Sequence, residues 1–403
     1  MRWSERFQTS WIHRKRIWRP WGKGHVRPRT GFAPNFRNDS SARSDRISRP
    51  ADMTLLHLSA EMGWRGGENQ LALIYTGLQT ESDQMLMVRR GSELERRMRD
   101  ERPVTASRFG LTAPRAAWSL RRKMLTSPGK HLIHAHCGKS AETALLARFG
   151  TQVPLVISRR SAYPIRSHWK FRAADAVIAV SRAASEELLK AGVDPSRIHI
   201  IPDAVDAPRF AGAIADRRDV APDEVMVLCA AALSPEKDHE VLLKAWKQVE
   251  EAGLKARLLM AGTGSMDGRL KSLAGSLDLR HVSFLGWVEN ISGTMAAADI
   301  AVLSSRVEGL ASFLCEAQFC GIPVVSTAAG GTVDAVRDGE TGFLSPTGDE
   351  NAFAENLTRL IRNSELRAGM GAAARTWARR KFALEPVLEA HRALYRQVLD
   401  GDR

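Results

Sequence analysis

The sequence predicts an α/β protein made of two doubly wound domains, and three observations carry this prediction. From Met53 onward, short apolar runs alternate with segments of helical period, which is the pattern of βαβ units. The alternation breaks over residues 206–222 and then restarts. The length of 403 residues also allows two separate hydrophobic cores. We therefore expect two parallel sheets, each covered by helices on both faces, with a ligand cleft between the domains.

The first domain is expected to span residues 53–205. It opens with the strand TLLHLSA, and the glycine loop after this strand leads into a helix near residues 68–79. The further expected strands are QMLMVRR (84–90), HLIHAHCG (131–138), PLVISRR (154–160), AVIAVS (176–181) and IHIIPDAV (198–205).

Residues 206–222 are expected to be a linker, and the second domain is expected to span residues 223–380. A final helical segment, 381–403, should pack back toward the first domain. The expected strands are VMVLCAA (225–231), ARLLMAGTG (256–264), VSFLGW (282–287), IAVLSS (300–305) and PVVSTAAG (323–330). The expected helices lie near 238–251, 269–279, 291–298, 310–320 and 331–337, with a helical pattern again over 350–400.

Residues 1–52 differ from the rest of the chain, with 13 Lys and Arg against 4 Asp and Glu and no strand or helix period. We expect this extension to be disordered. A clean strand follows Met53 at once, so Met53 is the expected true start of the protein. The alternative is a Trp- and Arg-rich arm that binds a membrane or a nucleic acid.

The net charge of +14 is unevenly distributed. Residues 53–205 hold 23 basic against 14 acidic side chains, whereas residues 206–403 hold 23 against 27. The basic front half favours an anionic partner, with phospholipid headgroups, nucleic acid and acidic glycans as the candidates. No apolar run approaches the roughly 20 residues of a membrane-spanning helix. The four cysteines show no zinc spacing, so we expect reduced thiols and a cytoplasmic protein.

Two carboxylates, Glu308 and Glu316, bracket seven uncharged residues in EGLASFLCE. A solvated surface helix is the simple interpretation, but an unpaired carboxylate in an apolar run needs a partner or a ligand. In a continuous helix the two would lie about 12 Å apart along the axis. The two catalytic carboxyl groups of a glycosidase lie within roughly 5 to 9.5 Å of each other. The spacing therefore suits the two ends of one extended ligand, with Gly309 opening a helix whose N–H groups favour an anion.

The spacing and its surroundings resemble glycosyltransferase family 4, whose retaining enzymes carry an EX7E motif. The motifs similar to its donor domain are GTGSMDG (262–268), FLGWVEN (284–290), AAADIAVLSSRVEG (296–309), CGIPVVSTAAGG (320–331) and DGETGFLSPTGD (338–349). Those similar to its acceptor domain are GGENQ (66–70), HAH (134–136), AVIAVS (176–181) and IPDAVD (201–206). The resemblance covers residues 53–380.

The resemblance implies a GT-B fold, in which two Rossmann-like domains face each other across a cleft and close on a nucleotide-diphosphate sugar. It implies that Glu316 accepts hydrogen bonds from the donor ribose and that Glu308 lies beside the transferred sugar. The N–H groups of Gly309, Leu310 and Ala311 would meet the diphosphate or the sugar. No metal and no other cofactor would be obligatory, and the chain has no DxD pair near a predicted nucleotide loop.

Lys237 resembles the family lysine that contacts the diphosphate, and here the chain departs from the pattern. The family usually has an arginine five residues earlier, where this sequence has Ala232. Arg159 or Arg160 could replace that cation, turnover could be slow, or the chain could be a catalytically inactive homologue.

Gly66 and Gly67 open a predicted helix after the first strand, so backbone N–H groups could approach the diphosphate there. His134 and His136 share one face of a strand and could both be core residues. Two histidines make a poor metal site. By the resemblance, His136 faces the sugar or the acceptor.

The predicted function is a retaining glycosyltransferase that moves a sugar from a nucleotide-diphosphate donor to a glycan or lipid-linked acceptor, in cell-envelope polysaccharide or lipopolysaccharide synthesis. The alternatives are a nucleotide-sugar epimerase of the same architecture and a non-catalytic binder of nucleotide sugar or nucleic acid. The predicted partners are the donor and the acceptor, with an anionic membrane surface as a further candidate and no nucleic acid.

The membrane prediction depends on the segment PRAAWSLRRKML (114–125), which has Arg and Lys on one helical face and Trp118 at its flank. An aromatic ring among cations suits a headgroup interface, so we expect peripheral binding at the inner face of the membrane. The alternative is an ordinary amphipathic helix whose apolar face, with Ala116, Leu120 and Met124, packs on its own sheet.

Overall fold

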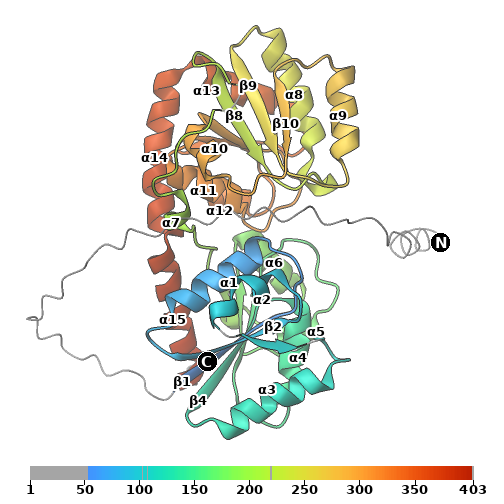
Figure 1. The fold of residues 1–403 in the computed structure, drawn as a ribbon, viewed down its shortest axis with the longest axis vertical. Helices are drawn as coiled ribbons and strands as arrows, with labels where there is room; N and C mark the ends of the chain where they lie inside the picture. Colours follow the sequence, from blue (N-terminus) through green and yellow to red (C-terminus); the bar gives the residue numbers. More distant parts are fainter. Residues whose placement is uncertain (1–52, 102, 107, 218–219, 402–403) are drawn as a thin grey trace, which may run out of the picture. The chain divides into compact units, whose positions relative to one another are not determined.

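The computed structural model describes residues 53–101, 103–106, 108–217 and 220–401 (Figure 1). The predictions made for residues 1–52 fall outside these described residues. Within them, the strands form two separate parallel sheets, one of seven and one of six strands. This is the doubly wound α/β architecture that the sequence predicts.

The N-terminal sheet has the strand order β3-β2-β1-β4-β5-β6-β7. Its central strands are buried on both faces, which explains why their sequences are continuous apolar runs rather than alternating ones. The strands are β1 (Met53–Ser59), β2 (Asp83–Arg89), β3 (Val104–Ala106), β4 (Lys130–Ala135), β5 (Leu155–Arg159), β6 (Ala176–Ala179) and β7 (Ile198–Ile200).

Helices cover both faces of this sheet. One face packs on α3 and α4, which also contact each other, and the other face packs on α1. The helices of this half are α1 (Gly66–Gly77), α2 (Glu93–Arg97), α3 (Pro114–Thr126), α4 (Gly138–Arg148), α5 (Trp169–Arg172), α6 (Arg182–Lys190) and α7 (Ala207–Phe210). Short 3-10 turns lie at Arg99–Glu101 and Pro195–Arg197.

The C-terminal sheet repeats the same winding with the order β10-β9-β8-β11-β12-β13. One of its faces buries a core under α8, α9 and α13, in which Trp246 and Phe353 are fully buried. The strands are β8 (Val225–Ala230), β9 (Ala256–Ala261), β10 (Val282–Gly286), β11 (Ile300–Leu303), β12 (Val324–Thr327) and β13 (Gly342–Ser345).

The opposite face of this sheet carries α10, α11, α12 and α14. The helices of this half are α8 (His239–Glu251), α9 (Asp267–Ser276), α10 (Ser292–Ala297), α11 (Ser312–Cys320), α12 (Thr332–Ala335), α13 (Glu350–Arg362), α14 (Ser364–Phe382) and α15 (Leu384–Asp400), with a 3-10 turn at Pro235–Lys237.

The last helix, α15, leaves the C-terminal half and packs on α1 and β4 of the N-terminal sheet (Figure 1). Val387, Leu388 and Leu394 of α15 are buried in the same core as Leu55 and Ile74. The crossover is fixed before α15 begins, because the backbone N–H of Val205 donates to the carbonyl of Phe382 at 2.7 Å. The N-terminal domain core is thus completed by the end of the chain.

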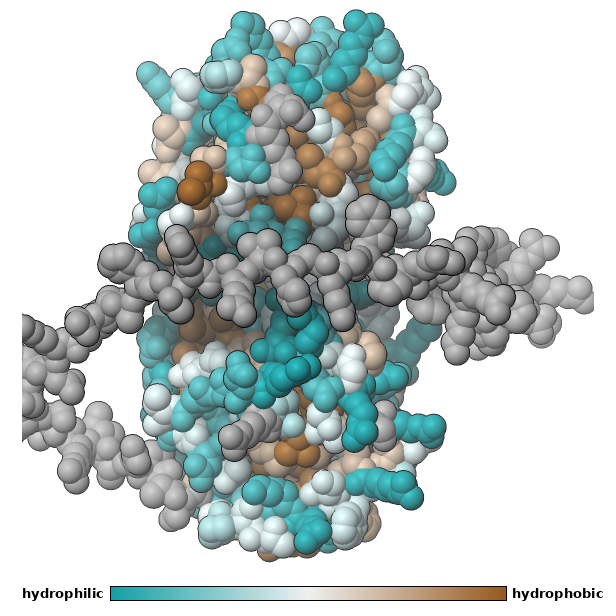
Figure 2. Space-filling model, viewed as in Figure 1, coloured by the Kyte–Doolittle hydropathy of each residue, from teal (hydrophilic) through white to brown (hydrophobic). Residues whose placement is uncertain are grey.

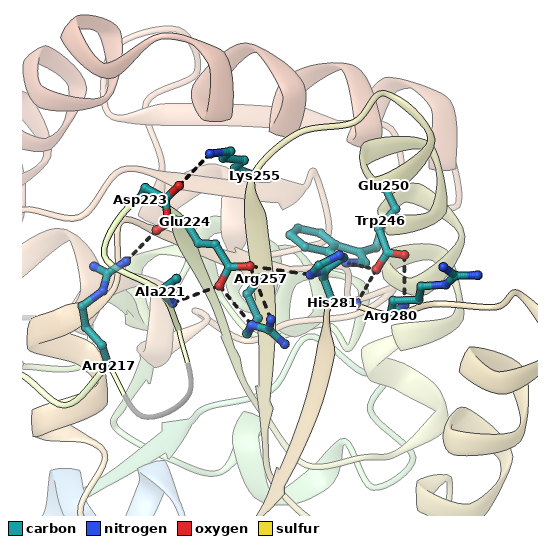
Figure 3. Close-up of polar contacts among 10 residues, drawn as sticks. All are labelled: Arg217, Ala221, Asp223, Glu224, Trp246, Glu250, Lys255, Arg257, Arg280 and His281. Atoms are coloured by element: carbon teal, nitrogen blue, oxygen red, sulfur yellow. Dashed lines mark hydrogen bonds and ion pairs between the residues drawn. The ribbon is translucent and has the colours of Figure 1, made fainter.

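Polar contacts at the amino ends of the strands hold the C-terminal sheet to the connecting segment and to the end of α8 (Figure 3). Arg217 donates to the carbonyl of Glu224 at 2.6 Å, and the Glu224 carboxylate accepts from Ala221 N–H and from Arg257. Glu250 accepts from Trp246 Nε1 and from the backbone of two residues that precede β10. These contacts lie at the amino ends of the strands, so they hold the sheet without reaching the carboxyl ends, where ligands bind.

Two short strands and one helix boundary differ from the sequence predictions. β3 and β13 were not predicted, because three or four residues show too little period to indicate a strand. The helix expected near 310–320 begins at Ser312, because Ala311 adopts a left-handed conformation with φ of 60°. Among the described residues, no helix has both the length and the apolar character needed to cross a bilayer.

Candidate functional site

A cavity of about 860 Å³ lies at the carboxyl ends of the central strands, and residues from both domains line it. Each sheet reverses its winding beside its first strand, between β1 and β4 and between β8 and β11. Ligands of doubly wound sheets bind at such switch points. The predicted site residues that line the cavity are Gly66, Gly67, His136, Lys237, Glu308, Gly309, Leu310 and Ala311. Glu316 is not part of the lining.

Glu308 and Lys237 meet inside this cavity although 71 positions separate them in the sequence. Glu308 follows β11 and Lys237 follows β8, so the two loops come from the strands on either side of the switch point. Lys237 Nζ pairs with Glu308 Oε1, and Ser305 Oγ donates to the same oxygen at 2.6 Å. The structure therefore places one carboxylate and one cation, each with little exposed surface, at a shared point of the cavity wall.

The loop Gly309–Ala311 presents backbone donors to the cavity. No hydrogen bond among the described residues uses the N–H groups of Gly309, Leu310 or Ala311. The loop is also closely packed, because a Cβ on Gly309 would lie 2.3 Å from the carbonyl oxygen of Arg160 in the other domain. Ala311 is strained by its positive φ, and strain of this kind is concentrated at functional sites. The loop offers three N–H groups to an anion in a fixed conformation.

Glu316 lies one helical turn into α11, outside the cavity lining, with 17% of its side chain exposed. Its nearest cation is Arg209 of α7, whose Nη1 lies 3.6 Å from Oε1. Burial raises the pKa of Glu316 to about 7, while Arg209 opposes the rise and Asp206 adds to it. A carboxyl with this pKa is easily converted between its neutral and its charged form near neutral pH.

His136 lines the cavity and His134 does not. β4 ends at Ala135, so His136 stands at the carboxyl end of the strand. His134 is fully buried, with Nδ1 2.7 Å from the Tyr395 hydroxyl and Nε2 2.8 Å from Ser158 Oγ. His134 is thus a structural residue that joins β4 to α15, and the role of His136 at the sugar or acceptor stays a prediction.

His57 on β1 is a residue that the sequence analysis missed. Its Nδ1 lies 3.1 Å from His136 Nε2, and the guanidinium nitrogens of Arg160 lie 3.4 Å from His136 Nδ1. Because a guanidinium can only donate, His136 Nδ1 accepts and its Nε2–H donates to His57. Burial, His134 and Arg160 lower the pKa of His136, and burial lowers the pKa of His57 to about 3. His136 is therefore held neutral in one tautomer.

His57, His134 and His136 have ligand atoms within 4.8 Å of one another, which is close enough for a shared metal ion. The rings of His134 and His136 stack with centroids 3.9 Å apart and planes 33° from parallel. Lone pairs lie in the ring plane, so stacked rings do not direct them at one ion. Both nitrogens of His134 are also already hydrogen-bonded. The donor set does not fit a metal, and the cluster is a hydrogen-bonded histidine network.

Gly66 and Gly67 begin α1 directly opposite the C-terminal domain. A Cβ on Gly66 would lie 3.5 Å from Ser312 Oγ, and one on Gly67 would lie 3.6 Å from Arg160 Cδ. Both distances are ordinary van der Waals contacts, so protein atoms alone do not require glycine at these positions. The space that a side chain would occupy belongs to the cavity.

Both arginines proposed to replace the missing family cation line the cavity, as does Ala232 itself. Arg160 Nε lies 3.1 Å from Asp203 Oδ1, and both side chains are largely buried. Arg159 donates to the carbonyl of Tyr163, and burial lowers its pKa.

The cavity contains further cations that the sequence analysis did not single out. Arg65, Arg166 and Lys170 also line it. The sequence does offer an indication of each. Arg65 lies directly before the glycine pair, and Arg166 and Lys170 belong to the basic run that follows β5. The lining therefore has more basic than acidic side chains, which suits an anionic ligand.

Two family profiles match adjacent parts of the chain. The profile described as "Glycosyltransferase Family 4" matches residues 64–209, and "Glycosyl transferases group 1" matches residues 213–377. A crystal structure of HepE from Anabaena in complex with UDP and glucose superposes with a TM-score of 0.72 at 22% identity, covering 86% of this chain and 100% of that one. Two doubly wound domains with a cavity at their switch points are the GT-B architecture.

Two relatives place the chain more closely. It is 32% identical over 210 residues to a GDP-mannose-dependent monoacylated alpha-(1-6)-phosphatidylinositol monomannoside mannosyltransferase of Corynebacterium glutamicum, covering 48% of this chain and 54% of that protein. It is 29% identical over 283 residues to a D-inositol 3-phosphate glycosyltransferase of Geodermatophilus obscurus, covering 61% and 63%. The matches thus span about half to two thirds of these relatives. The chain belongs to glycosyltransferase family 4.

Proposed function

We propose that this chain is a retaining glycosyltransferase that transfers a sugar from a nucleotide-diphosphate donor to a glycan or lipid-linked acceptor. The observation that carries the proposal is the meeting of Glu308 and Lys237 beside the free N–H groups of the loop Gly309–Ala311. A cation and backbone donors suit a diphosphate, and the carboxylate beside them suits the sugar that the diphosphate carries. The named relatives are a GDP-mannose-dependent mannosyltransferase of a phosphatidylinositol monomannoside and an inositol 3-phosphate glycosyltransferase, which supports the same class.

In the proposed reaction, the acceptor hydroxyl attacks the anomeric carbon on the face from which the diphosphate departs. The bond to the diphosphate oxygen breaks, negative charge develops on the leaving group, and the proton of the acceptor hydroxyl passes to a diphosphate oxygen. Lys237 and the N–H groups of Gly309, Leu310 and Ala311 stabilise that charge, with Gly66 and Gly67 approaching the diphosphate from the other domain. No obligatory cofactor is needed for this stabilisation.

Positive charge develops on the sugar at the same time, because glycosyl transfer passes through an oxocarbenium-like state. The carboxylate of Glu308 would lie beside that sugar and stabilise it. His136, held in one tautomer by Arg160 and His57, would contact the sugar or the acceptor hydroxyl. Glu316 would accept the hydrogen bonds of the donor ribose once the domains close on the nucleotide.

Peripheral binding to an anionic membrane at its inner face is part of the proposal, with cell-envelope glycan synthesis as the setting. The apolar face of α3 is not available for this, because Ala116, Leu120 and Met124 are buried in the domain core. This packing is the alternative expected from the sequence. A different surface of α3 and α4 supports membrane binding, and we call it the α3–α4 surface.

The α3–α4 surface exposes three large apolar side chains beside basic residues. Trp118 is 63% exposed, Leu125 is 67% exposed and Phe149 is 83% exposed. Arg122 stacks over the Trp118 ring at 5.7 Å, and Lys123 is exposed next to it. At the lower end of the face in Figure 2, where α3 lies in Figure 1, hydrophilic and apolar residues are mixed. Aromatic rings among cations suit a headgroup layer.

The enzymatic proposal is tested by screening the purified chain against UDP-, GDP- and ADP-sugars for binding and slow donor hydrolysis. An acceptor that gains the mass of a sugar identifies a transferase, whereas a sugar that changes without transfer identifies an epimerase. Binding of a donor with no turnover in any combination would favour a non-catalytic binder instead.

The membrane proposal is tested by sedimentation with vesicles, using the full chain and a chain that starts at Met53. We expect binding to anionic but not to neutral vesicles, decreasing as salt rises. Replacing Trp118, Arg122 and Lys123 should weaken it. Arg121 is left unchanged because it donates to the carbonyls of Ala147 and Phe149 and thus supports the fold. Absence of binding at low salt by the chain from Met53 would favour a soluble acceptor.

A further inference from the structure

A second cavity, of about 680 Å³, lies in the N-terminal domain where β2 and β3 end and α3 begins. None of the residues that line the donor cavity belongs to it. We call it the arginine pocket, after the side chains that define its polar lining: Arg90, Arg108, Arg115, Thr105, Thr112 and Ser119. Within the described part of the chain, its lining contains no acidic residue.

Among the described residues, no carboxylate pairs with the three arginines of this pocket. No ion pair or side-chain hydrogen bond among the described residues involves Arg90, Arg108 or Arg115. Nearby arginines behave differently, since Arg96 and Arg97 both pair with Glu93 on α2. Like charges that line one cavity repel one another, and a bound anion relieves that repulsion. All three side chains are exposed, so a ligand can reach them.

The backbone around the pocket adds further donors. α3 begins at Pro114, its N-cap residue Ala113 provides no side-chain cap, and its first turn contains no acidic residue. Among the described residues, the N–H groups of Ala113, Ala116 and Ala117 have backbone acceptors, so the first turn leaves the Arg115 N–H and the positive end of the helix dipole beside the guanidinium groups. Hydroxyls of two threonines and one serine complete a donor-rich lining. The pocket thus has two independent sources of positive potential, side-chain and backbone.

We propose that the arginine pocket binds a phosphate group of the acceptor. Guanidinium groups bind phosphate oxygens in two-pronged pairs, and a phosphate has enough oxygens to engage several arginines at once. The pocket lies at the carboxyl ends of β2 and β3, and in a parallel sheet this is the same edge at which β1 and β4 meet the donor cavity. A phosphorylated acceptor held there would reach toward the donor along that edge.

This inference rests on the proposed function, because it names the chemistry of the acceptor for the same cleft. The phosphate could come from a soluble sugar phosphate or from a lipid headgroup, and the recognition chemistry is shared. Only the lipid phosphate can be presented on the surface of a vesicle, and the experiment below distinguishes the two sources by this difference.

The test is titration of the full chain with inorganic phosphate while a saturating nucleotide diphosphate, UDP or GDP as the donor screen indicates, fills the donor cavity. The variant is Arg90→Gln, Arg108→Gln and Arg115→Gln combined, and the matched control is Arg96→Gln. We expect the triple variant to bind phosphate about 10-fold more weakly or worse. The control variant and the nucleotide affinity should stay within about 2-fold of the original chain.

A second set of variants keeps the test decisive if the triple variant unfolds. Replacing each arginine singly with lysine retains the charge and removes the two-pronged geometry. Each such variant should lose part of the phosphate affinity at an unchanged melting temperature. Phosphate affinity that is unaffected by all of these replacements, or no phosphate binding by the original chain, overturns the inference.

Vesicles identify the source of the phosphate. The chain is bound to phosphatidylcholine vesicles that contain phosphatidic acid, and inorganic phosphate is added at constant ionic strength. If phosphate releases the original chain from the vesicles but does not release the triple variant, the acceptor phosphate belongs to a lipid. Phosphate binding in solution without release supports a soluble acceptor. If nucleotide sugars do not bind at all, the proposed function fails by itself, and if they bind while phosphate does not, only this inference fails.

Discussion

The affinity of the chain for its nucleotide-sugar donor should rise with pH, and Glu316 is the expected cause. A ribose hydroxyl donates its hydrogen bond best to a charged carboxylate, so the donor selects the ionised form of Glu316. In the donor-free protein, burial holds the pKa of this group at about 7. Donor binding must therefore remove a proton from Glu316 at pH 6 but rarely at pH 8.

The size of the effect follows from that pKa. About one tenth of Glu316 is ionised at pH 6 and about nine tenths at pH 8, so donor affinity should rise by up to about 10-fold, or 1.4 kcal/mol. Folding stability changes in the opposite direction. A carboxyl whose pKa is raised on folding stabilises the free protein below its unfolded pKa, and this contribution is lost as pH rises through about 7.

The assay is calorimetric titration with an intact nucleotide-diphosphate sugar, whose phosphates do not titrate in this range. His136 does not titrate in this range either, because its pKa is well below its ordinary value. Glu316→Gln should weaken binding by about 1.5–3 kcal/mol at pH 8 and remove the pH dependence. Arg209→Ala should move the midpoint to higher pH, since Arg209 lowers the pKa of Glu316. An unchanged slope in the glutamine variant would refute the reasoning.

Four further outcomes are expected. Glu308→Gln should leave donor affinity within about 2-fold but lower kcat by about 10-fold or more, measured by turnover and calorimetry, because the carboxylate acts on the developing charge. Lys237→Ala should lower kcat by more than about 2-fold, and a smaller loss would argue against its role at the diphosphate. Ala232→Arg should raise kcat, because position 232 lines the cavity where the family cation is missing; no gain would argue against that reasoning. Gly309→Ala should lower both the melting temperature and turnover, costing about 1–3 kcal/mol, because its Cβ would meet the backbone of the other domain at 2.3 Å. Glu224→Gln should cost about 1–3 kcal/mol in chemical denaturation while donor affinity stays unchanged, because its contacts lie at the amino ends of the strands (Figure 3).

Local sequence pattern was sufficient for the long strands and helices. The apolar run at the start of the described chain predicts a strand at 54–60, and β1 spans Met53–Ser59. Such segments are buried on both faces, so their composition is determined by the core. β3 is only three residues long, and its strand character comes from pairing with β2 rather than from its own sequence.

Only part of the candidate site could be predicted from the sequence, and its contacts could not. The EX7E spacing points to Glu308, and the likeness of the Lys237 loop to the family's diphosphate loop points to Lys237. Only the folded chain shows that the two side chains pair. His57 was missed because one polar residue in an apolar strand gives no indication of its partner 79 positions away. The arginine pocket was missed for the same reason, because its cations come from two strand ends and a helix start.

The return of α15 to the N-terminal sheet has a consequence for the order in which the protein can fold during synthesis. Domains usually fold as they leave the ribosome, N-terminal part first. Here Tyr395, which binds His134, and Leu388, which packs against Gly77, lie in α15 and are translated only after the whole C-terminal sheet. The core of the N-terminal domain therefore stays incomplete until α15 has been synthesised. A premature stop before α15 would therefore damage the half of the protein made first.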